Sequence, residues 1–357
     1  MKIFTKQILQ WYGVNKRDLP WRASKDPYKI WLSEIILQQT RVAQGLPYYR
    51  KFVEAFPTVN DLAEAPVDTV LRLWQGLGYY SRARNLHACA KQIVDEYGGN
   101  FPDSAQELLK LKGVGPYTAS AIASMAFNEV VPVVDGNVYR VLSRYDDDST
   151  DISGGTAYSH FYSRAQELIS SNHPGEFNQA MMEFGATHCT PKAPLCADCI
   201  FQLDCKAYQN NTVLDRPVKL KKVKVTNRTF HYIVFEHDDQ ILVRQRKGKD
   251  IWQGLHDFHC IEGEYQVEEL LSQLNSEVGD KSMAKYVLEN QSIDIKHVLT
   301  HQRITARFYH FRAGSAEVLN ETCEKLSLIS VDHQGLNDLA KPILIENYLK
   351  NSALSLF

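Results

Sequence analysis

The sequence of 357 residues has little excess charge of either sign. Lys and Arg together number 40 and Asp and Glu number 42, so the net charge is −2. A protein that binds a polyanion through bulk charge carries a clear basic excess, and the composition excludes that mode of binding. Only residues 216–228 are locally basic, with six basic residues and no acidic residue. This stretch could contact phosphates or form a solvated connector.

From the printed sequence we expect neither a membrane-spanning helix nor an export signal. No apolar run approaches the roughly 18 residues that a membrane-spanning helix needs. The first residues, from Met1 to Trp11, are amphipathic and do not have the apolar core of a signal peptide. We therefore expect a cytoplasmic protein that does not bind membranes.

The seven cysteines do not suit a disulfide framework, because their number is odd and no export signal is present. Four of them follow the spacing C-x6-C-x2-C-x5-C: Cys189, Cys196, Cys199 and Cys205. Four thiolates this close in sequence can surround one cluster of four irons and four sulfurs. Zinc sites more often combine two separated pairs of ligands, and this stretch has a single C-x2-C pair. The spacing favours the iron–sulfur cluster, and a zinc site is the alternative.

Apolar periodicity divides the chain into a helical part and a mixed part. Residues 1–205 are predicted to be mostly helical, with helical spacing of apolar residues in 31–39, 70–74, 83–97 and 161–170. Residues 209–228 lack this periodicity, contain Pro217 and are predicted to be a linker. A separate α+β domain is predicted over 229–357, from strand patterns at 230–235, 240–244 and 304–311 and helical patterns at 268–274 and 340–350.

A glycine-containing turn joins two predicted helices at residues 111–119, with the sequence LKGVGPYTA. Ser104 begins a capping box that opens the first helix, and Pro116 suits the first turn of the second. Gly113 and Gly115 allow a tight turn and close backbone approach. The amides at the start of the second helix could then bind a DNA phosphate, as in a helix-hairpin-helix. An ordinary helical turn is the alternative, because G-x-G alone is a weak signal.

The hairpin, the string VDGNV at residues 134–138 and the cysteine spacing together resemble the endonuclease III superfamily of DNA glycosylases. Further strings resemble its adenine DNA glycosylase branch, MutY: LPW at 19–21, LSEIILQQT at 32–40, GLGYY at 76–80, RARN at 82–85 and FNQAMM at 177–182. The resemblance covers nearly the whole chain and weakens after Arg228.

The resemblance implies a multidomain fold, in which an all-α helix-hairpin-helix glycosylase region with a [4Fe-4S] cluster loop precedes an α+β Nudix-like domain. Residues 1–18 and 130–208 would form the cluster domain, and 19–129 a six-helix domain that carries the hairpin. Residues 209–228 would be the linker, and 229–357 a Nudix-like domain that recognises 8-oxoguanine. One [4Fe-4S] cluster per chain would shape a DNA-binding loop in which Lys192 meets phosphate.

Glu34 and Asp135 are the candidate catalytic carboxylates. Cleavage of an N-glycosidic bond passes through an oxocarbenium-like transition state, which suits one protonated and one ionised carboxyl group. Both residues have apolar sequence neighbours, and burial would raise the pKa of Glu34. Without the resemblance, Glu34 would be assigned to a solvated helix face and Asp135 to a helix N-cap. The resemblance implies that Glu34 protonates adenine at N7 and later activates water, while Asp135 stabilises or covalently traps the sugar cation.

Tyr117 and Asn137 would orient these two carboxyl groups. Bifunctional relatives have a lysine at the hairpin position of Tyr117, and its amine attacks the sugar as a Schiff-base nucleophile. A tyrosine cannot form an imine. The resemblance therefore implies a monofunctional glycosylase that leaves an abasic site.

By the same resemblance, residues of the helical part contact DNA: Gln39, Thr40, Leu77, Tyr79, Gly113, Val114, Gly115 and Thr118. Gln39 and Tyr79 would wedge beside the opposite base when the adenine is flipped out. The C-terminal domain lacks the catalytic Nudix box, so we do not expect pyrophosphate hydrolysis. Relatives read 8-oxoguanine with a Phe-Ser-His loop. The aligned segment here is Leu299-Thr300-His301, which keeps a hydroxyl in Thr300 and the imidazole in His301 but replaces the aromatic residue.

The resemblance thus implies a monomeric adenine DNA glycosylase of base excision repair, associated with the nucleoid of a bacterial cytoplasm. Its substrate would be double-stranded DNA with adenine opposite 8-oxoguanine or G, and its protein partners are not indicated. The rival hypotheses are a bifunctional pyrimidine glycosylase, a thymine-mismatch glycosylase and a catalytically inactive DNA-binding protein. The C-terminal domain disfavours the first two, and the presence of both Glu34 and Asp135 disfavours the third.

Overall fold

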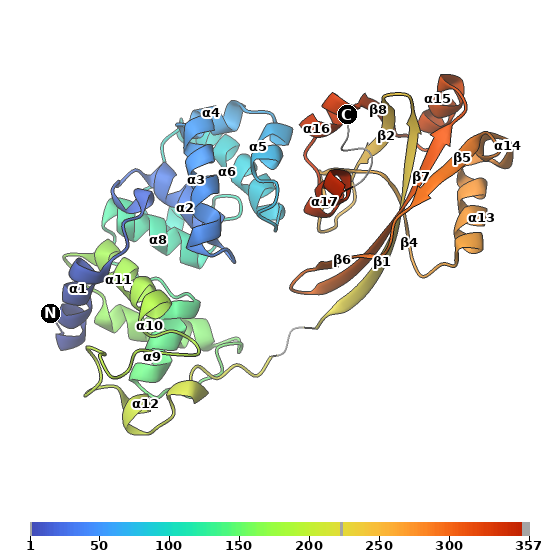
Figure 1. The fold of residues 1–357 in the computed structure, drawn as a ribbon. Helices are drawn as coiled ribbons and strands as arrows, with labels where there is room; N and C mark the ends of the chain where they lie inside the picture. The colour runs from blue at the N-terminus through green and yellow to red at the C-terminus, as the bar shows by residue number, and fades with distance from the viewer. Residues whose placement is uncertain (1, 222–223, 352–357) are drawn as a thin grey trace. The chain divides into compact units, whose positions relative to one another are not determined.

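The computed structural model describes residues 2–221 and 224–351, and its contacts divide the chain into two compact units. The first unit comprises residues 1–64 and 85–222, and the second comprises 65–84 and 223–357. Figure 1 shows both units as a ribbon, with labels on the helices and strands where there is room. None of the helices in the described residues has the length and apolar character of a membrane span.

The first unit is helical, as predicted. Its helices are α1 (Ile3–Asn15), α2 (Pro27–Leu37), α3 (Val42–Ala55), α4 (Val59–Glu64), α7 (Ala105–Leu108), α8 (Pro116–Phe127), α9 (Gly136–Tyr145), α10 (Ala157–Leu168), α11 (Pro174–Thr187) and α12 (Lys206–Gln209). Two 3₁₀ turns, η1 (Pro20–Arg22) and η2 (Val213–Asp215), complete it. Helix α6 (Ser81–Tyr97) begins in the second unit and continues into the first.

Local sequence explains where the helices that carry the site begin. Helix α2 starts after Asp26, whose side chain accepts the N–H of Tyr28, and Pro27 occupies its first turn. Helix α9 starts after Asp135, which caps it in the same way. Most residues of α2 are buried, because the helix is apolar on nearly all sides. A polar side chain of α2, such as that of Glu34, is therefore largely enclosed by protein.

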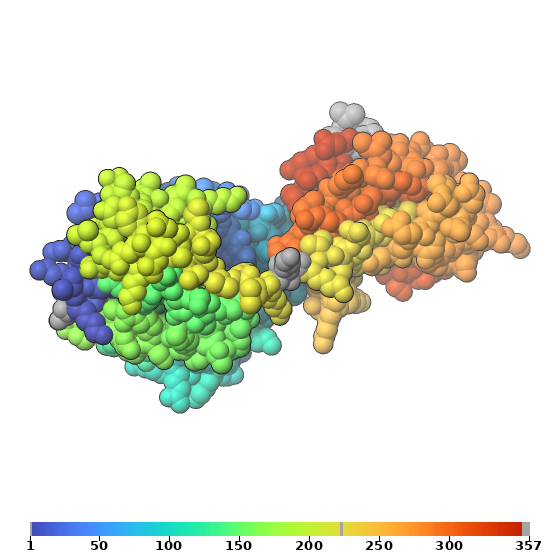
Figure 2. Space-filling view, turned by 90° about the horizontal axis from the view of Figure 1, so that it is seen from below, coloured from blue at the N-terminus to red at the C-terminus, as the bar shows by residue number. Residues whose placement is uncertain are grey.

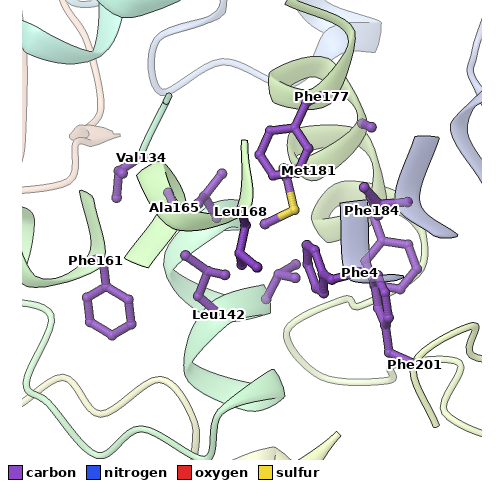
Figure 3. Close-up of a cluster of buried hydrophobic side chains, with 14 of the residues drawn as sticks. Phe4, Val134, Leu142, Phe161, Ala165, Leu168, Phe177, Met181, Phe184 and Phe201 are labelled. Atoms are coloured by element: carbon purple, nitrogen blue, oxygen red, sulfur yellow. The ribbon is translucent and has the colours of Figure 1, made fainter. Parts of the chain in front are cut away.

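A cluster of buried aromatic and aliphatic side chains holds α1, α9, α10 and α11 together (Figure 3). The ring of Phe4 in α1 stacks on Phe201 at a centroid distance of 4.4 Å, and Phe184 in α11 meets Phe201 edge-on at 5.3 Å. Phe201 lies between Cys199 and Cys205 in the sequence. The cysteine loop is therefore anchored in the core by its own aromatic residue, against the N-terminal helix.

The second unit combines a sheet with helices on both faces. Its strands are β1 (Thr226–His237), β2 (Gln240–Gln245), β3 (His256–Asp257), β4 (His259–Glu262), β5 (Tyr286–Gln291), β6 (Ile295–Val298), β7 (Gln302–Ala313) and β8 (Ile329–Asp332). Its helices are α5 (Val67–Leu73), α13 (Val267–Val278), α14 (Asp280–Met283), α15 (Ala316–Lys325), α16 (His333–Asp338) and α17 (Ile343–Asn351).

Strands β1 and β7 form the centre of this sheet and run parallel, with Ile233 opposite Tyr309. The main strand order is β3-β2-β1-β7-β5. Successive side chains of a strand point to opposite faces. Tyr309 packs in the core with α13 and α15, while the adjacent Phe308 stacks on Tyr348 of α17 at 3.7 Å. Helix α17 therefore covers the face opposite to α13 and α15 (Figure 1).

Two boundaries differ from those predicted. The predicted linker 209–228 includes the end of α12, the turn η2 and the first residues of β1, which begins at Thr226. Residues 65–84, predicted within the six-helix domain, group with the C-terminal domain. The physical reason for the second difference is a set of polar contacts, which include an ion pair of 2.7 Å from Arg72 to Asp338 and a hydrogen bond from Arg84 to the carbonyl of Gln253.

Candidate active site

A cavity of about 590 Å³ in the first unit brings together all four predicted catalytic residues: Glu34, Tyr117, Asp135 and Asn137. They come from α2, from the start of α8, and from the cap and first turn of α9. Its size is typical of pockets that bind small organic groups. The sequence spacing does not indicate that these residues share a cavity, because they lie as far apart in the chain as positions 34 and 137.

Glu34 is buried, with 8% of its surface exposed. Burial raises the pKa of Glu34 to about 7, because the charged form loses its hydration. The hydroxyl of Tyr117 donates a hydrogen bond of 2.5 Å to Oε2 of Glu34, and this contact lowers the pKa of Glu34 against the larger effect of burial. Glu34 can therefore hold a proton near neutral pH and release it to a bound group.

Tyr117 keeps its own proton. Burial and the nearby carboxyl groups of Glu34 and Asp135 raise the pKa of Tyr117 well above its usual value. Its hydroxyl also approaches the sulfur of Met182 at 3.3 Å. Tyr117 is thus a fixed hydrogen-bond donor that orients the carboxyl group of Glu34.

Asp135 combines the N-cap role with a place in the cavity. Its Oδ1 accepts the backbone N–H groups of Asn137 and Val138 at 2.9 and 2.8 Å, and its Oδ2 accepts the side-chain amide of Asn137 at 2.7 Å. Burial raises the pKa of Asp135, and these hydrogen bonds oppose that rise because they stabilise the carboxylate. The helix N-cap, which the sequence offered as the alternative role of Asp135, is therefore present, and it fixes the direction in which the carboxylate points.

The amide of Asn137 connects Asp135 to the cysteine loop. Its Oδ1 accepts a hydrogen bond of 2.8 Å from Arg140, and the Nε of Arg140 donates to the carbonyl of Cys189 at 2.7 Å. The amide of Asn137 donates to Asp135 and accepts from Arg140, and Arg140 donates to the carbonyl of Cys189, so the position of Asp135 is linked to the backbone at Cys189.

Sequence reasoning missed a third carboxyl group in the cavity wall, that of Glu183. Glu183 of α11 is almost fully buried, and its carboxylate pairs with Arg17 at 2.7 Å and Arg22 at 2.6 Å. Burial alone would raise the pKa of Glu183, but the hydrogen bonds from both arginines outweigh it and lower the pKa to about 2. Glu183 is an acid in an apolar helix, the same signal that singled out Glu34, and it could have been found in that way.

The predicted hairpin is present between α7 and α8. Ser104 caps α7 by accepting the N–H of Glu107, which is one half of the predicted capping box, while the side chain of Glu107 pairs with Lys110 instead of the backbone of Ser104. Gly113 has a φ of +75°, and a Cβ added there would lie 2.7 Å from the Cβ of Asn85. Both the left-handed backbone and the close approach require glycine at this position. The turn holds Val114, Gly115 and Thr118 at the start of α8, where helix amides have no partners within the helix.

Gln39 and Thr40 follow the C-terminal end of α2. Gln39 is exposed and has a left-handed φ of +57°, which points the chain away from the helix. Thr40 lines the cavity. The amide of the preceding residue, Gln38, donates to Thr118 at 3.3 Å, which ties the end of α2 to the hairpin.

A second pocket, of about 500 Å³, lies within the second unit, and Leu77, Tyr79, Thr300 and His301 all line it. The hydroxyl groups of Tyr79 and Thr300 are 2.6 Å apart. Tyr79 has a φ of +50° and 44% of its surface exposed, whereas Leu77 is buried. The ring of Trp252 lines the same pocket. The structure thus brings the predicted wedge residue Tyr79 together with the predicted loop at Thr300.

The four predicted metal ligands lie in the loop between α11 and α12, at the surface of the first unit (Figure 2, yellow-green). All four thiols are free and half-buried. Burial raises the pKa of Cys199 to about 12, and the other three sulfurs are close enough to add to this rise. In the described part of the chain, no group of three or more His, Cys, Asp or Glu side chains is arranged to hold a single metal ion. Lys192 is exposed in this loop.

Two family models match the chain. Residues 32–168 match the HhH-GPD superfamily of base excision DNA repair proteins, and residues 231–351 match the NUDIX domain. Among solved structures, a thermostable thymine-DNA glycosylase is similar with a TM-score of 0.54 and 29% identity, over 58% of this chain and 96% of that one. An endonuclease III–DNA complex has a TM-score of 0.50 at 22% identity, over 58% and 95% of the two chains, and supports the same fold.

Several curated relatives share the name adenine DNA glycosylase. The mouse protein is 46% identical over 58% of this chain, and the match spans 42% of the mouse protein's length. The relative from Buchnera aphidicola (subspecies Baizongia pistaciae) is 35% identical over 84% of this chain and 83% of its own. The Schizosaccharomyces pombe relative is 31% identical over 97% and 88% of the two chains. This chain therefore belongs to the adenine DNA glycosylase family, MutY, within the helix-hairpin-helix superfamily of base excision DNA repair proteins.

Proposed function

We propose that the protein is a monofunctional DNA glycosylase, which hydrolyses the N-glycosidic bond of adenine opposite 8-oxoguanine or G in duplex DNA. The observation that carries this proposal is the pair of buried carboxyl groups in one cavity. The pKa of Glu34 is raised to about 7, while Asp135 is held by three hydrogen bonds that stabilise its carboxylate. Two carboxyl groups with different tendencies to ionise suit the acid and the ionised partner of glycoside cleavage.

In this mechanism Glu34 donates its proton to N7 of the flipped adenine, which makes the base a neutral leaving group. The carboxylate of Asp135 stabilises, or covalently traps, the sugar cation that forms as the bond breaks. Tyr117 directs the carboxyl group of Glu34 through its hydrogen bond, and Asn137 directs that of Asp135. Glu34, now ionised, then activates the water that attacks the sugar.

The cavity supports hydrolysis without an imine intermediate. A Schiff-base mechanism needs an amine near the sugar, and Tyr117 stands where bifunctional relatives have a lysine. Among the described residues, none of those that line the cavity is a lysine. The expected product is an abasic site with an intact strand.

Duplex DNA is the proposed partner of a monomeric protein. Backbone amides of Gly113 and Gly115 would bind a phosphate at the start of α8. Val114 and Thr118 would support this turn, because the N–H of Val114 donates to the carbonyl of Leu111 and the buried hydroxyl of Thr118 accepts from Gln38. Gln39 and Thr40 would lie beside the opposite base. These contacts use dipoles and placed groups, which agrees with the absence of a basic excess.

We assign the pocket of the second unit to the base opposite the adenine. Tyr79 offers an aromatic surface on which a base can stack. The paired hydroxyls of Tyr79 and Thr300 offer hydrogen bonds by which the protein would distinguish 8-oxoguanine from G. Leu77 and His301 complete the pocket wall. This assignment gives the C-terminal domain a role in recognition.

The cofactor proposed for the cysteine loop is one [4Fe-4S] cluster, held by Cys189, Cys196, Cys199 and Cys205. Four free thiols in one loop match the donor set that such clusters use. When bound, the cluster would fix the shape of the loop and the position of Lys192 for a phosphate contact. No step on the adenine is assigned to it.

A substrate panel tests the function. The purified protein is given duplexes with A opposite 8-oxoguanine, A opposite G, T opposite G, and thymine glycol, and base release is measured. We expect release from the first two duplexes, faster from the first. Release confined to the last two would contradict the proposal and would favour a pyrimidine glycosylase.

Borohydride reduction during the reaction tests the monofunctional assignment. We expect no covalent protein–DNA adduct from the wild-type protein, because no amine attacks the sugar. Strong adduct formation on a duplex with A opposite 8-oxoguanine would contradict it.

A further inference from the structure

Arg144 of α9 is a buried arginine that has no acidic partner among the residues that the structure describes. Only 2% of its surface is exposed. Within residues 2–221 and 224–351, no carboxylate lies at ion-pair distance from its guanidinium group. Other well-paired arginines of the first unit do have such partners, for example Arg164, which binds Asp146 at 2.7 Å.

Carbonyl oxygens from two segments surround the guanidinium group instead. Its Nε donates to the carbonyls of Val213 and Arg216 at 2.8 and 3.2 Å. Its Nη1 and Nη2 donate to the carbonyls of Thr190 and Pro191 at 2.8 and 3.1 Å. These contacts satisfy the hydrogen-bond donors, but carbonyl dipoles do not neutralise a full charge.

Two cysteine sulfurs also contact Arg144. Its Nη1 lies 3.3 Å from Sγ of Cys189, and Sγ of Cys205 lies 3.3 Å from its main-chain carbonyl. Arg144 therefore touches the first and the last of the four cysteines, one with its side chain and one with its backbone. A guanidinium group aimed at a sulfur from a position fixed by carbonyl groups is suited to an anionic sulfur.

Burial of a charge is costly unless an opposite charge accompanies it. A neutral thiol does not compensate a guanidinium group. Cysteines bind metal as thiolates, and four thiolates carry more negative charge than the iron–sulfur core balances. A cluster in this loop would therefore supply the counter-charge that no carboxylate of the described residues gives to Arg144.

We propose that Arg144 is a positioning residue that supplies the internal counter-charge for a four-thiolate iron–sulfur centre. This inference rests on the cluster proposed above. The positive charge beside Cys189 stabilises the more negatively charged states of the centre, so it raises the reduction potential. The carbonyls of the linker start, at Val213 and Arg216, hold the guanidinium group in place for this purpose.

The test compares Arg144→Gln and Arg144→Lys with the wild-type protein. Arg164→Gln is the matched control, because it removes a partly exposed arginine that has acidic partners of its own. Iron per chain, the helical content and the reduction potential by voltammetry are measured on each full-length protein. The potential is the decisive readout, since a merely structural role would not move it.

We expect Arg144→Gln to lower the reduction potential by at least about 59 mV, which corresponds to a tenfold change in the equilibrium constant of a one-electron couple. Arg144→Lys retains the charge, so its potential should stay near that of the wild type, as should that of Arg164→Gln. A normal potential in folded, iron-loaded Arg144→Gln would overturn the proposal. Equal shifts in the Gln and Lys variants would also overturn it, because hydrogen bonds and not charge would then be responsible.

If Arg144→Gln does not retain iron, the proposal is tested by the iron content of Arg144→Lys. Normal iron content in Arg144→Lys beside a loss in Arg144→Gln supports the counter-charge, and loss in both variants overturns it. The iron content of the wild-type protein is tested separately: wild-type protein without iron would refute the cluster itself. Adenine release by the wild type reports on the proposed function independently of both outcomes.

Discussion

Replacement of Tyr117 by phenylalanine tests the origin of the raised pKa of Glu34. Burial raises this pKa to about 7, and the hydroxyl of Tyr117 opposes burial because it donates to the carboxylate at 2.5 Å. Removal of the hydroxyl should therefore raise the pKa of Glu34 further. The protonated acid should then persist to higher pH.

The size of the shift follows from the lost hydrogen bond. A hydrogen bond to a charged group contributes about 1.5–3 kcal/mol, and one pH unit corresponds to about 1.4 kcal/mol. The carboxyl group of Glu34 faces an open cavity, where water can replace part of the lost contact. We therefore expect an upward shift of about one pH unit.

The assay is single-turnover adenine release across neutral and alkaline pH. The wild-type rate should fall as pH rises through about 7, because the form with protonated Glu34 is lost. In Tyr117→Phe the rate of adenine release should fall at a pH about one unit higher than in the wild type. Tyr97→Phe, which does not line the cavity, is the control. An unchanged or lower midpoint in an active Tyr117→Phe would refute this explanation of the pKa.

Three other variants test separate parts of the structure. Glu183→Gln removes a buried carboxylate with two arginine partners and should lower the free energy of unfolding by about 2–4 kcal/mol at neutral pH. Because the pKa of Glu183 in the folded protein is about 2, the difference in stability between wild type and variant should vanish as pH falls toward that value, as measured by urea titration. Gly113→Ala places a methyl group at a crowded position with a left-handed backbone and should weaken DNA binding about tenfold in a titration. The control Gly13→Ala has open space for its methyl group and should bind DNA like the wild type, and equal affinities of the two variants would contradict the role of the hairpin. Thr300→Ala removes the hydroxyl that pairs with Tyr79, so the ratio of adenine release opposite 8-oxoguanine to release opposite G should fall severalfold, and an unchanged ratio would exclude this role.

Local features of the site could be predicted from the sequence. Asp135 was expected to cap a helix, because an Asp before a helical pattern commonly does so, and it caps α9. Glu34 was singled out as an acid among apolar residues, and it is buried. The central strands and the helix α6 were predicted close to their observed places. These features depend on a few neighbouring residues, which the sequence displays directly.

Contacts between distant segments could not be predicted in this way. The pairing of Glu183 with Arg17 and the hydrogen bond from Tyr117 to Glu34 join residues far apart in the chain. The parallel pairing of β1 with β7 likewise depends on the whole sheet. Residues 70–74 show helical spacing of apolar residues, which is a local signal and does not reveal that segment 65–84 makes its contacts with the C-terminal domain. Arg144 gave no local signal at all, because its role depends on carbonyls from two distant loops.

Binding and base release by Glu34→Gln test the central claim most directly. The glutamine has nearly the shape of the glutamate but cannot donate a carboxylic proton, so the variant should bind the duplex with A opposite 8-oxoguanine about as tightly as the wild type. Its single-turnover release of adenine should fall by at least a hundredfold, since general acid catalysis commonly contributes about 10²–10⁴ in rate. Adenine release by Glu34→Gln at a rate near that of the wild type would contradict this mechanism, because cleavage of the glycosidic bond would then not require the proton of Glu34.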